Sequence, residues 1–337
     1  MGTPAVAVRG LVKRYGAVEA VRGIDLEVAR GETFGFLGPN GAGKSTTINI
    51  LCTLVEPTDG HAEVVGLDVV RDRAAVRRRI GLVFQDPTLD APMSGEQNLR
   101  FHQELYGVDR RRAAARREEV LRMVGLWERR GDEVRTYSGG MRRRLEIARG
   151  LLHSPQVLFL DEPTIGLDPQ TRGTIWDYVA ELHRNPQNQG DEEITVFVTT
   201  HYMDEAEHCD RIAIMNEGRI VALDTPDALK AQVGADRVAL TTDDDEAALA
   251  ALRSELGLEG AVREGAVTVA VPDGAGFVPR LFDRLGHHGV GIRSVTVTRP
   301  SLDDVFLAHT GTTIRDAEAG PGAARGLHPM AMRMRGR

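Results

Sequence analysis

The sequence predicts an α/β protein with two domains, and three observations carry this prediction. Strand-like and helix-like stretches alternate through residues 5–224, as they do in α/β folds. An apolar strand at 33–37 runs directly into a glycine-rich loop that a helix should follow. From residue 237 the order becomes strand, helix, strand, strand, helix, strand, the split arrangement of an α+β ferredoxin-like domain.

Hydrophobic patterning places the elements of the first domain. Residues 5–8 and 24–28 alternate apolar and polar side chains, which is typical of half-buried antiparallel strands. The segment 94–125 is rich in Leu, Arg, Glu and Ala and should be mostly helical, and further helices are expected at 44–54 and from about residue 138. The other predicted strands are 33–37, 80–84, 157–160, 194–199 and 211–215.

The second domain is expected at 237–311, after a linker at 225–236. Its predicted strands are 237–242, 260–263, 266–271 and 292–298, with helices at 243–256, 276–285 and 301–307. Ser301 is suited to cap the last helix, because acids follow it in the first turn. The polar, turn-rich segment 183–193 suggests a surface insertion, and the Gly-, Ala-, Pro- and Arg-rich tail 312–337 is expected to be disordered.

Composition excludes several classes of function. The 337 residues are enough for two cores, and the net charge of −7 argues against nucleic acid as the main partner. No apolar run approaches the roughly 18 residues of a membrane-spanning helix. Residues 1–8 lack the basic and apolar regions of a secretory signal.

Residues 38–45 read Gly-Pro-Asn-Gly-Ala-Gly-Lys-Ser and fit the pattern G-x-x-x-x-G-K-[ST]. The glycines let successive N–H groups point at phosphate oxygens, and the following helix adds its positive N-terminus. Lys44 can reach the β- and γ-phosphates, and the Ser45 hydroxyl can bind Mg²⁺. The expected nucleotide-binding residues of this loop are Gly38, Pro39, Asn40, Gly41, Ala42, Gly43, Lys44, Ser45 and Thr46.

Two further motifs carry chemistry. The apolar strand at 157–160 ends in Asp161 and Glu162. Such an aspartate can help to hold Mg²⁺, and a second carboxylate beside it can polarise an attacking water. Ser138, Gly139 and Gly140 open a helix, where exposed amides and a hydroxyl can bind an anion. A helix cap alone would explain the serine but not both glycines.

The order of these motifs resembles ABC transporter nucleotide-binding domains over residues 5–224. The resemblance rests on six features in sequence: the loop at 38–45, Gln85, Ser138–Gly140, Asp161–Glu162, Gly166-Leu-Asp-Pro169, and His201. It implies a P-loop NTPase cassette with a mixed sheet in a RecA-like core, an antiparallel β subdomain and a helical subdomain at about 94–153.

The resemblance also implies roles for single residues. Tyr15 would stack on the adenine of ATP, and Gln85 would contact Mg²⁺ or the water and sense a transmembrane partner. Glu162 would be the general base and His201 the γ-phosphate contact. Ser138, Gly139 and Gly140 would contact the γ-phosphate bound to another subunit, and Asp168 would report across the interface. The active form would therefore be a head-to-tail homodimer with two ATP molecules.

One position departs from the common family pattern. Met141 stands where glutamine usually follows the two glycines, and its side chain cannot make that residue's hydrogen bonds. Slower or retuned turnover is expected. The contacts of Ser138 and of the backbone should remain.

The runs Ser138–Leu145, Thr199–Glu207 and Ser301–Phe306 look most like the daunorubicin-resistance type of export ATPase. That resemblance implies a separate permease chain, a place at the cytoplasmic face of the membrane, and export of a drug-like or lipid-like compound. Two alternatives stay open. One is a soluble ABC ATPase acting on ribosomes or DNA, although the motifs occur once and no sustained heptads separate them. The other is a degenerate cassette that only binds nucleotide, which Lys44, Asp161, Glu162 and His201 argue against.

Overall fold

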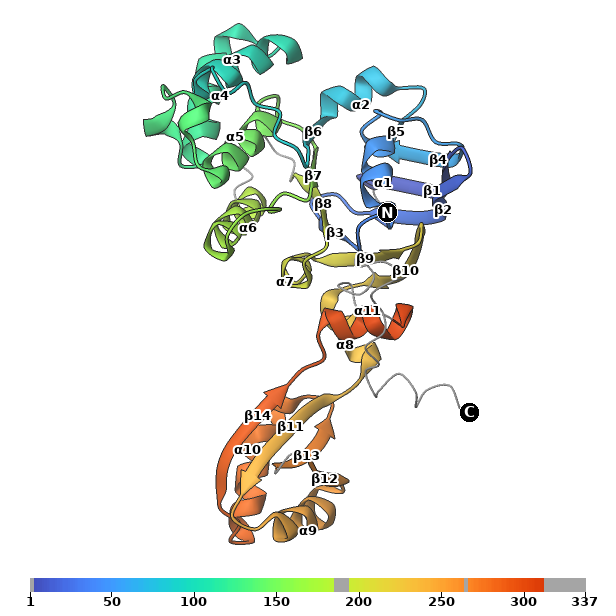
Figure 1. Ribbon diagram of the computed structural model, residues 1–337, viewed down its shortest axis with the longest axis vertical. Coiled ribbons are helices and arrows are strands. Elements are labelled where there is room, and N and C mark those ends of the chain that lie inside the picture. Colours follow the sequence, from blue (N-terminus) through green and yellow to red (C-terminus); the bar gives the residue numbers. More distant parts are fainter. Residues whose placement is uncertain (1–2, 185–193, 264–265, 312–337) are drawn as a thin grey trace. The chain divides into compact units, whose positions relative to one another are not determined.

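The computed structural model describes residues 3–184, 194–263 and 266–311. The described chain forms two units that meet at Thr225 and Pro226, and each is described by itself (Figure 1). The tail 312–337 and residues 185–193 of the expected insertion lie outside the described residues.

A six-stranded mixed sheet forms the centre of the first unit, in the order β10-β9-β3-β8-β7-β6. Its five strands from β9 to β6 run parallel, and β10 pairs antiparallel at one edge. Every residue of β3, β7 and β8 is buried, as expected of parallel strands covered on both faces. The bounds are β3 Thr33–Leu37, β6 Ile80–Val83, β7 Val157–Asp161, β8 Thr195–Thr200, β9 Arg211–Asn216 and β10 Arg219–Asp224.

An antiparallel sheet of order β2-β1-β4-β5 lies beside the mixed sheet (Figure 1). The predicted strands at 5–8 and 24–28 are present and antiparallel, but they extend to β1 Val6–Tyr15 and β2 Val18–Val28. The strands β4 Asp59–Val64 and β5 Leu67–Asp68 and helix α2 Arg73–Arg79 were not predicted. Only Ala62 and Val64 of β4 are fully buried, so its apolar pattern is too short to predict a strand. Helix α1 Lys44–Leu51 is close to its predicted span.

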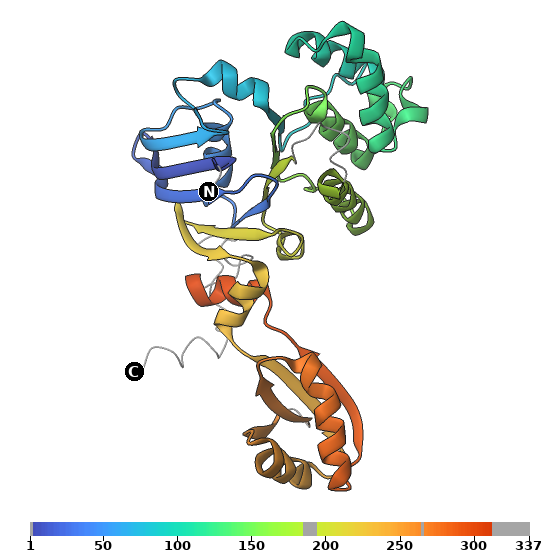
Figure 2. The same cartoon turned by 180° about the vertical axis from the view of Figure 1, so that it is seen from behind.

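Helices gather on the opposite side of the parallel strands from the antiparallel sheet (Figures 1 and 2). The segment 94–125 forms two helices rather than one, because Gly107 ends the first in a left-handed conformation and Asp109 caps the second. Ser94 begins the first with a capping box. Besides α1 and α2, the described part of this unit contains the helices α3 Gly95–Tyr106, α4 Arg110–Met123, α5 Gly139–Leu151, α6 Pro169–Arg184 and α7 Met203–Ala206, with single turns at Trp127–Arg129 and Val134–Thr136.

The second unit contains the predicted ferredoxin-like domain. Its sheet has the order β12-β13-β11-β14, and its core gathers residues of the sheet and of helices α9 and α10. The elements are β11 Asp236–Thr242, α9 Asp245–Leu256, β12 Gly260–Arg263, β13 Ala266–Val271, α10 Gly274–His287 and β14 Ile292–Thr298. Helix α11 Leu302–Thr310 follows, capped by Ser301 as expected.

The predicted linker at 225–236 was wrong over most of its length. Residues Pro226–Val233 form helix α8, which buries Leu229 and packs against α11. Proline is favoured in the first turn of a helix, and Pro226 is the first residue of α8. In the described ranges, no helix is both long and apolar enough to cross a membrane.

Four phenylalanines form the aromatic centre of the first unit's core. The Phe197 ring lies 5.4 Å from the rings of Phe34 and Phe159 and 5.7 Å from that of Phe36, measured between centroids. All four side chains are fully buried. The three strands that carry the site described below are therefore held together by one cluster.

We expect Phe197→Ala to lower the free energy of unfolding by about 3–5 kcal/mol, because it removes a buried ring and leaves a cavity. Phe197→Leu should cost less, about 1–2 kcal/mol. Urea unfolding followed by tryptophan fluorescence measures this, since Trp127 and Trp176 both lie in the first unit. The exposed Phe101→Ala is the control, and equal effects for Phe101 and Phe197 would contradict the assignment of the core.

Candidate active site

The loop after β3 is shaped by close backbone contacts. A Cβ on Gly38 would lie 2.2 Å from the Met215 carbonyl oxygen, and one on Gly43 would lie 2.4 Å from that of Ala20. Gly43 also has a φ of 110°, in the region that favours glycine. Gly43 begins α1 without any side-chain cap. The first N–H groups of α1 can therefore serve an anion.

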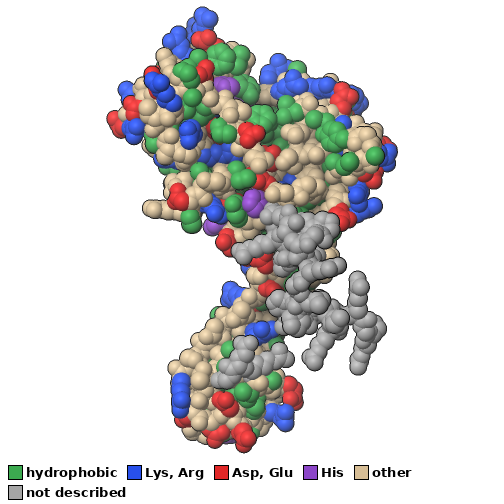
Figure 3. Space-filling model, in the orientation of Figure 1, with side chains coloured by type: hydrophobic (Ala, Val, Ile, Leu, Met, Phe, Trp, Pro, Cys, Tyr) green, Lys and Arg blue, Asp and Glu red, His purple; other side chains and the backbone are tan. Residues whose placement is uncertain are grey.

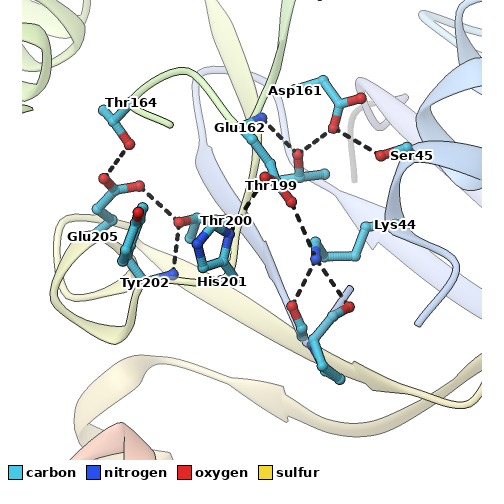
Figure 4. A network of polar contacts seen from close by, with 12 residues as sticks. Lys44, Ser45, Asp161, Glu162, Thr164, Thr199, Thr200, His201, Tyr202 and Glu205 are labelled. Carbon is cyan, nitrogen blue, oxygen red and sulfur yellow. Dashed lines mark hydrogen bonds and ion pairs between the residues drawn. The ribbon is translucent and has the colours of Figure 1, made fainter. Parts of the chain in front are cut away.

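Lys44 lies inside this loop. Its Nζ donates to the carbonyl oxygens of Gly38 at 2.6 Å and Pro39 at 3.1 Å, and it lies 3.4 Å from Glu162 Oε1 (Figure 4). The Lys44 side chain is 3% exposed. A buried ammonium needs an opposite charge, and the Glu162 carboxylate supplies it.

Asp161 and Ser45 place two oxygens side by side at the end of β7. Ser45 Oγ donates to Asp161 Oδ1 at 3.2 Å, and Thr199 Oγ1 donates to the same oxygen at 2.6 Å (Figure 4). Burial raises the pKa of Asp161, against the hydrogen bonds from Thr199 and Ser45 that lower it. The three residues come from α1, β7 and β8, so the strand order brings them together.

Glu162 follows in a strained backbone conformation, with a φ of 46°. Its N–H donates to Thr199 Oγ1 at 3.0 Å, and its Oε2 lies 3.3 Å from His201 Nδ1, within ion-pair range but off hydrogen-bond alignment. Burial acts to raise the pKa of Glu162, yet the contact with His201 and the charge of Lys44 outweigh it and leave that pKa below its usual value. The carboxylate is therefore held in its charged form.

A third buried carboxylate joins the two chain segments on either side of this cluster. Glu205 of α7, 3% exposed, accepts hydrogen bonds from Thr164 Oγ1 and, at 2.7 Å, from Thr200 Oγ1 (Figure 4). Thr200 Oγ1 also accepts from the Tyr202 N–H at 3.0 Å. The turn carrying His201 is thus bound to the segment that leaves Glu162.

The helix starts at Ser138 and Asp168 lie next to each other. Ser138 Oγ accepts from the Met141 N–H at 3.2 Å, and Asp168 Oδ1 accepts from the Thr171 N–H at 3.0 Å. Hydrogen bonds from Thr171 lower the pKa of the Asp168 carboxyl. A Cβ on Gly140 would lie 2.4 Å from Thr171 Cγ2, so packing of α5 on α6 requires that glycine.

The remaining predicted residues differ in their exposure. Tyr15, 47% exposed, ends β1, and the Lys13 ammonium lies 4.9 Å from its ring centroid. Gln85 is exposed two residues beyond β6. In the loop and first helical turn, Asn40 and Gly41 are exposed, Pro39 and Ala42 are buried, and Thr46 is half-buried.

Sequence reasoning did not single out Thr199, Glu205 or the buried Arg143 as site residues. Thr199 had a signal, because two threonines end the β-branched strand directly before His201. Glu205 lies in an acid-rich run that looks like a solvated helix face. Nothing in its local pattern distinguishes it from the exposed Asp204.

Comparison with known proteins identifies the family of this chain. The family model described as ABC transporter matches residues 21–165, and the model described as the C-terminal domain of DrrA1-3-like ATP-binding proteins matches 225–310. The chain is 42% identical over 322 residues to the daunorubicin resistance ATP-binding protein DrrA3 of Streptomyces coeruleorubidus, covering 95% of this chain and 100% of that protein. It is 37% identical to the linearmycin resistance ATP-binding protein LnrL of Bacillus subtilis, covering 90% and 97%.

Solved structures give the same class. The protein cbiO1 from Clostridium perfringens, part of the ABC transporter complex cbiONQ, aligns with a TM-score of 0.62 at 28% identity, over 68% of this chain and 92% of that one. A dimeric ATP-binding cassette in a post-hydrolysis state with ADP and Pi aligns with a TM-score of 0.57 at 26% identity, over 65% and 98%. The fold and the site thus define an ABC-type ATP hydrolase. Within that class the chain belongs to the drug-resistance exporter family of ATP-binding subunits, the daunorubicin-resistance type.

We expect Thr164→Val and Glu205→Ala each to destabilise the first unit, because each removes a buried hydrogen bond to a carboxylate. The double variant should cost less than the sum, with a coupling of about 1–2 kcal/mol in urea unfolding. The control is the double variant of Thr164→Val with Asp204→Ala, because Asp204 is an exposed acid on the same helix as Glu205. Additive costs for the Thr164 and Glu205 variants would show that the two residues do not act together.

Proposed function

We propose that this chain is the motor subunit of an exporter, working as a head-to-tail homodimer on a separate permease at the cytoplasmic face of the membrane. The observation that carries the proposal is the convergence of Lys44, Glu162 and His201 with the Ser45–Asp161 pair at the carboxyl ends of β3, β7 and β8. A cation for phosphate, two oxygens for a metal and a charged base lie together there.

The chemistry of each group supports a hydrolytic role. Lys44 pairs with the β- and γ-phosphates of ATP, and the N–H groups at the start of α1 bind the same oxygens. Ser45 and Asp161 offer hard oxygen donors 3.2 Å apart, which suit Mg²⁺, and Gln85 is the proposed third ligand. That ion would neutralise charge on the transferred phosphoryl group.

Glu162 is the proposed general base. Its carboxylate is charged and buried, so it can accept a proton from a water aligned on the γ-phosphate. His201, next to it, is the proposed γ-phosphate contact. Tyr15 offers an exposed ring for the adenine.

The exposed starts of helices α5 and α6 support the proposal of a dimer. Ser138, Gly139 and the Asp168 segment are exposed, and Figures 1 and 2 draw α5 and α1 on opposite sides of the parallel strands. An anion at the start of α5 is therefore best supplied by ATP on another subunit. The dimeric relative with ADP and Pi fits this arrangement.

An apolar recess beside Gln85 supports the proposal that a permease binds this unit. The recess has a volume of about 300 Å³, and its lining includes Leu54, Phe84 and Tyr106. On α3, Phe101 is 52% and Leu105 65% exposed, so large apolar side chains continue beyond it. Hydrophobic side chains also reach the surface of this unit on the face drawn in Figure 3. A hydrophobic segment of a membrane partner would cover them and touch the loop that carries Gln85.

The relatives suggest the kind of cargo. Two that match most of this chain are named for resistance to daunorubicin and to linearmycin. We therefore propose a drug-like or lipid-like compound as the exported substrate.

Glu162→Gln tests the hydrolytic role. It should keep ATP binding, lose turnover by about 100-fold or more as loss of a general base does, and accumulate a dimer with ATP in gel filtration. Lys44→Ala is the contrasting variant, because it should lose ATP binding as well. Normal turnover by Glu162→Gln would refute the assignment of the base, and a monomer with bound ATP would refute the head-to-tail homodimer.

Capture from detergent-solubilised cells tests the partner, with tagged Glu162→Gln held closed by ATP. A polytopic membrane protein is expected, and adding Phe101→Ser should weaken its recovery. Phe282→Ser is the matched control, because Phe282 is a similarly exposed phenylalanine, at 49%, in the second unit. Recovery of ribosomal or DNA-bound proteins, without a membrane protein, would overturn the permease proposal.

A further inference from the structure

A buried arginine on α5 contacts both loops that carry the proposed catalytic residues. The Arg143 side chain is 7% exposed. Its Nε donates to the Pro163 carbonyl oxygen at 2.6 Å, and its Nη2 donates to those of Asp161 and Glu162, each at 3.0 Å. One guanidinium thus holds three successive carbonyls of the turn around Glu162.

The other end of the guanidinium holds the second loop. Arg143 Nη1 donates to the Phe84 carbonyl oxygen at 2.5 Å and to Glu146 Oε2 at 2.9 Å. Glu146, one helical turn further along α5, accepts the Thr88 N–H at 2.8 Å through its other oxygen. The pair therefore holds residues on both sides of Gln85.

These contacts use all five N–H donors that an arginine possesses. A lysine has three donors on a single atom and cannot form this planar fork. Glutamine has two donors and no charge to balance Glu146. The site is therefore specific for arginine, and the Glu146 carboxylate compensates the buried charge.

The contact to Glu162 bears on its backbone. A non-glycine residue with a φ of 46° is strained and persists only where its surroundings hold it. Thr199 fixes the Glu162 N–H and Arg143 fixes its carbonyl oxygen, so the two bonds hold this conformation from both sides. The Glu162 side chain is thereby directed toward Lys44 and His201 (Figure 4).

We propose that Arg143, with Glu146, is a positioning residue that ties the orientation of Glu162 and of the Gln85 loop to the position of helix α5. Helix α5 begins at Ser138, the proposed contact to the ATP of the other subunit. Movement of that helix on dimer closure therefore acts directly on the base and on the loop facing the permease. The inference rests on the proposed roles of Glu162 and Ser138.

Steady-state ATP hydrolysis by the purified full chain tests this, with nucleotide affinity measured on the same samples. In Arg143→Lys, kcat should fall by about 100-fold, the cost of a base displaced by about 1 Å, while the Kd for ATP stays within about threefold. The double variant Arg143→Gln with Glu146→Gln removes both buried charges and keeps few of the donors. It should regain folding stability but not kcat.

Arg116 provides a matched control. It is 8% exposed, lies in the helical part of the same unit, and pairs with Glu119 three residues later, but its Nη2 donates to the Leu151 carbonyl oxygen, away from both loops. Arg116→Lys should lower thermal stability like Arg143→Lys and leave kcat per folded molecule unchanged.

Two results would overturn the inference. One is an equal kcat per folded molecule in the Arg143→Lys and Arg116→Lys variants. The other is recovery of wild-type kcat in the double glutamine variant, which would mean that Arg143 only stabilises the fold. Glu162→Gln in the same assay distinguishes failure of the proposed function from failure of the positioning role of Arg143. If it hydrolyses ATP normally, the proposed function fails, whereas if it is inactive and the Arg143 variants are normal, only the positioning role fails.

Discussion

Parallel pairing of β3, β8 and β7 is the constraint on which the site depends. The register sets Leu37 opposite Thr200, and Thr199 opposite Asp161, so three chain segments leave the sheet at one edge. The loop holding Lys44, the turn at Glu162 and the turn at His201 begin there. Since the strands are buried on both faces and joined by the Phe197 cluster, their ends have little freedom to move.

Buried charge is the second feature that shapes the site. Lys44 balances Glu162, and Arg143 balances Glu146, each within a few ångströms. Removing one member of such a pair leaves an uncompensated charge, which typically costs about 3–5 kcal/mol. The proposed catalytic groups are therefore held by the same interactions that stabilise this part of the fold, and replacing one of them changes more than its own chemistry.

The sequence predicted the motifs well and their surroundings less well. The loop at 38–45 and Asp161–Glu162 were recognisable because each combines a strand end with residue types that suit phosphate chemistry, whereas His201 was identified through the family resemblance. Gly139 and Gly140 look alike in sequence, yet the structure separates them, because only Gly140 lies against Thr171 in the packing of α5 on α6. Helix α8 was missed because its apolar face is short and its partner α11 lies about 70 residues further along the chain.

The sequence alone determined the α/β class, the ferredoxin-like order of the second domain, and the residue types that can handle a nucleotide. These follow from local properties: hydrophobic period, glycine-rich turns, and the spacing of polar groups at strand ends. Only the tertiary structure decided that Ser45 and Thr199 donate to one oxygen of Asp161. It alone decided that Glu205 joins the Thr164 segment to the His201 turn, and that Arg143 holds the turn around Glu162 and the loop of Gln85. Those contacts join residues 18 to 116 positions apart or depend on which side chain is buried, and no local pattern encodes such a pairing.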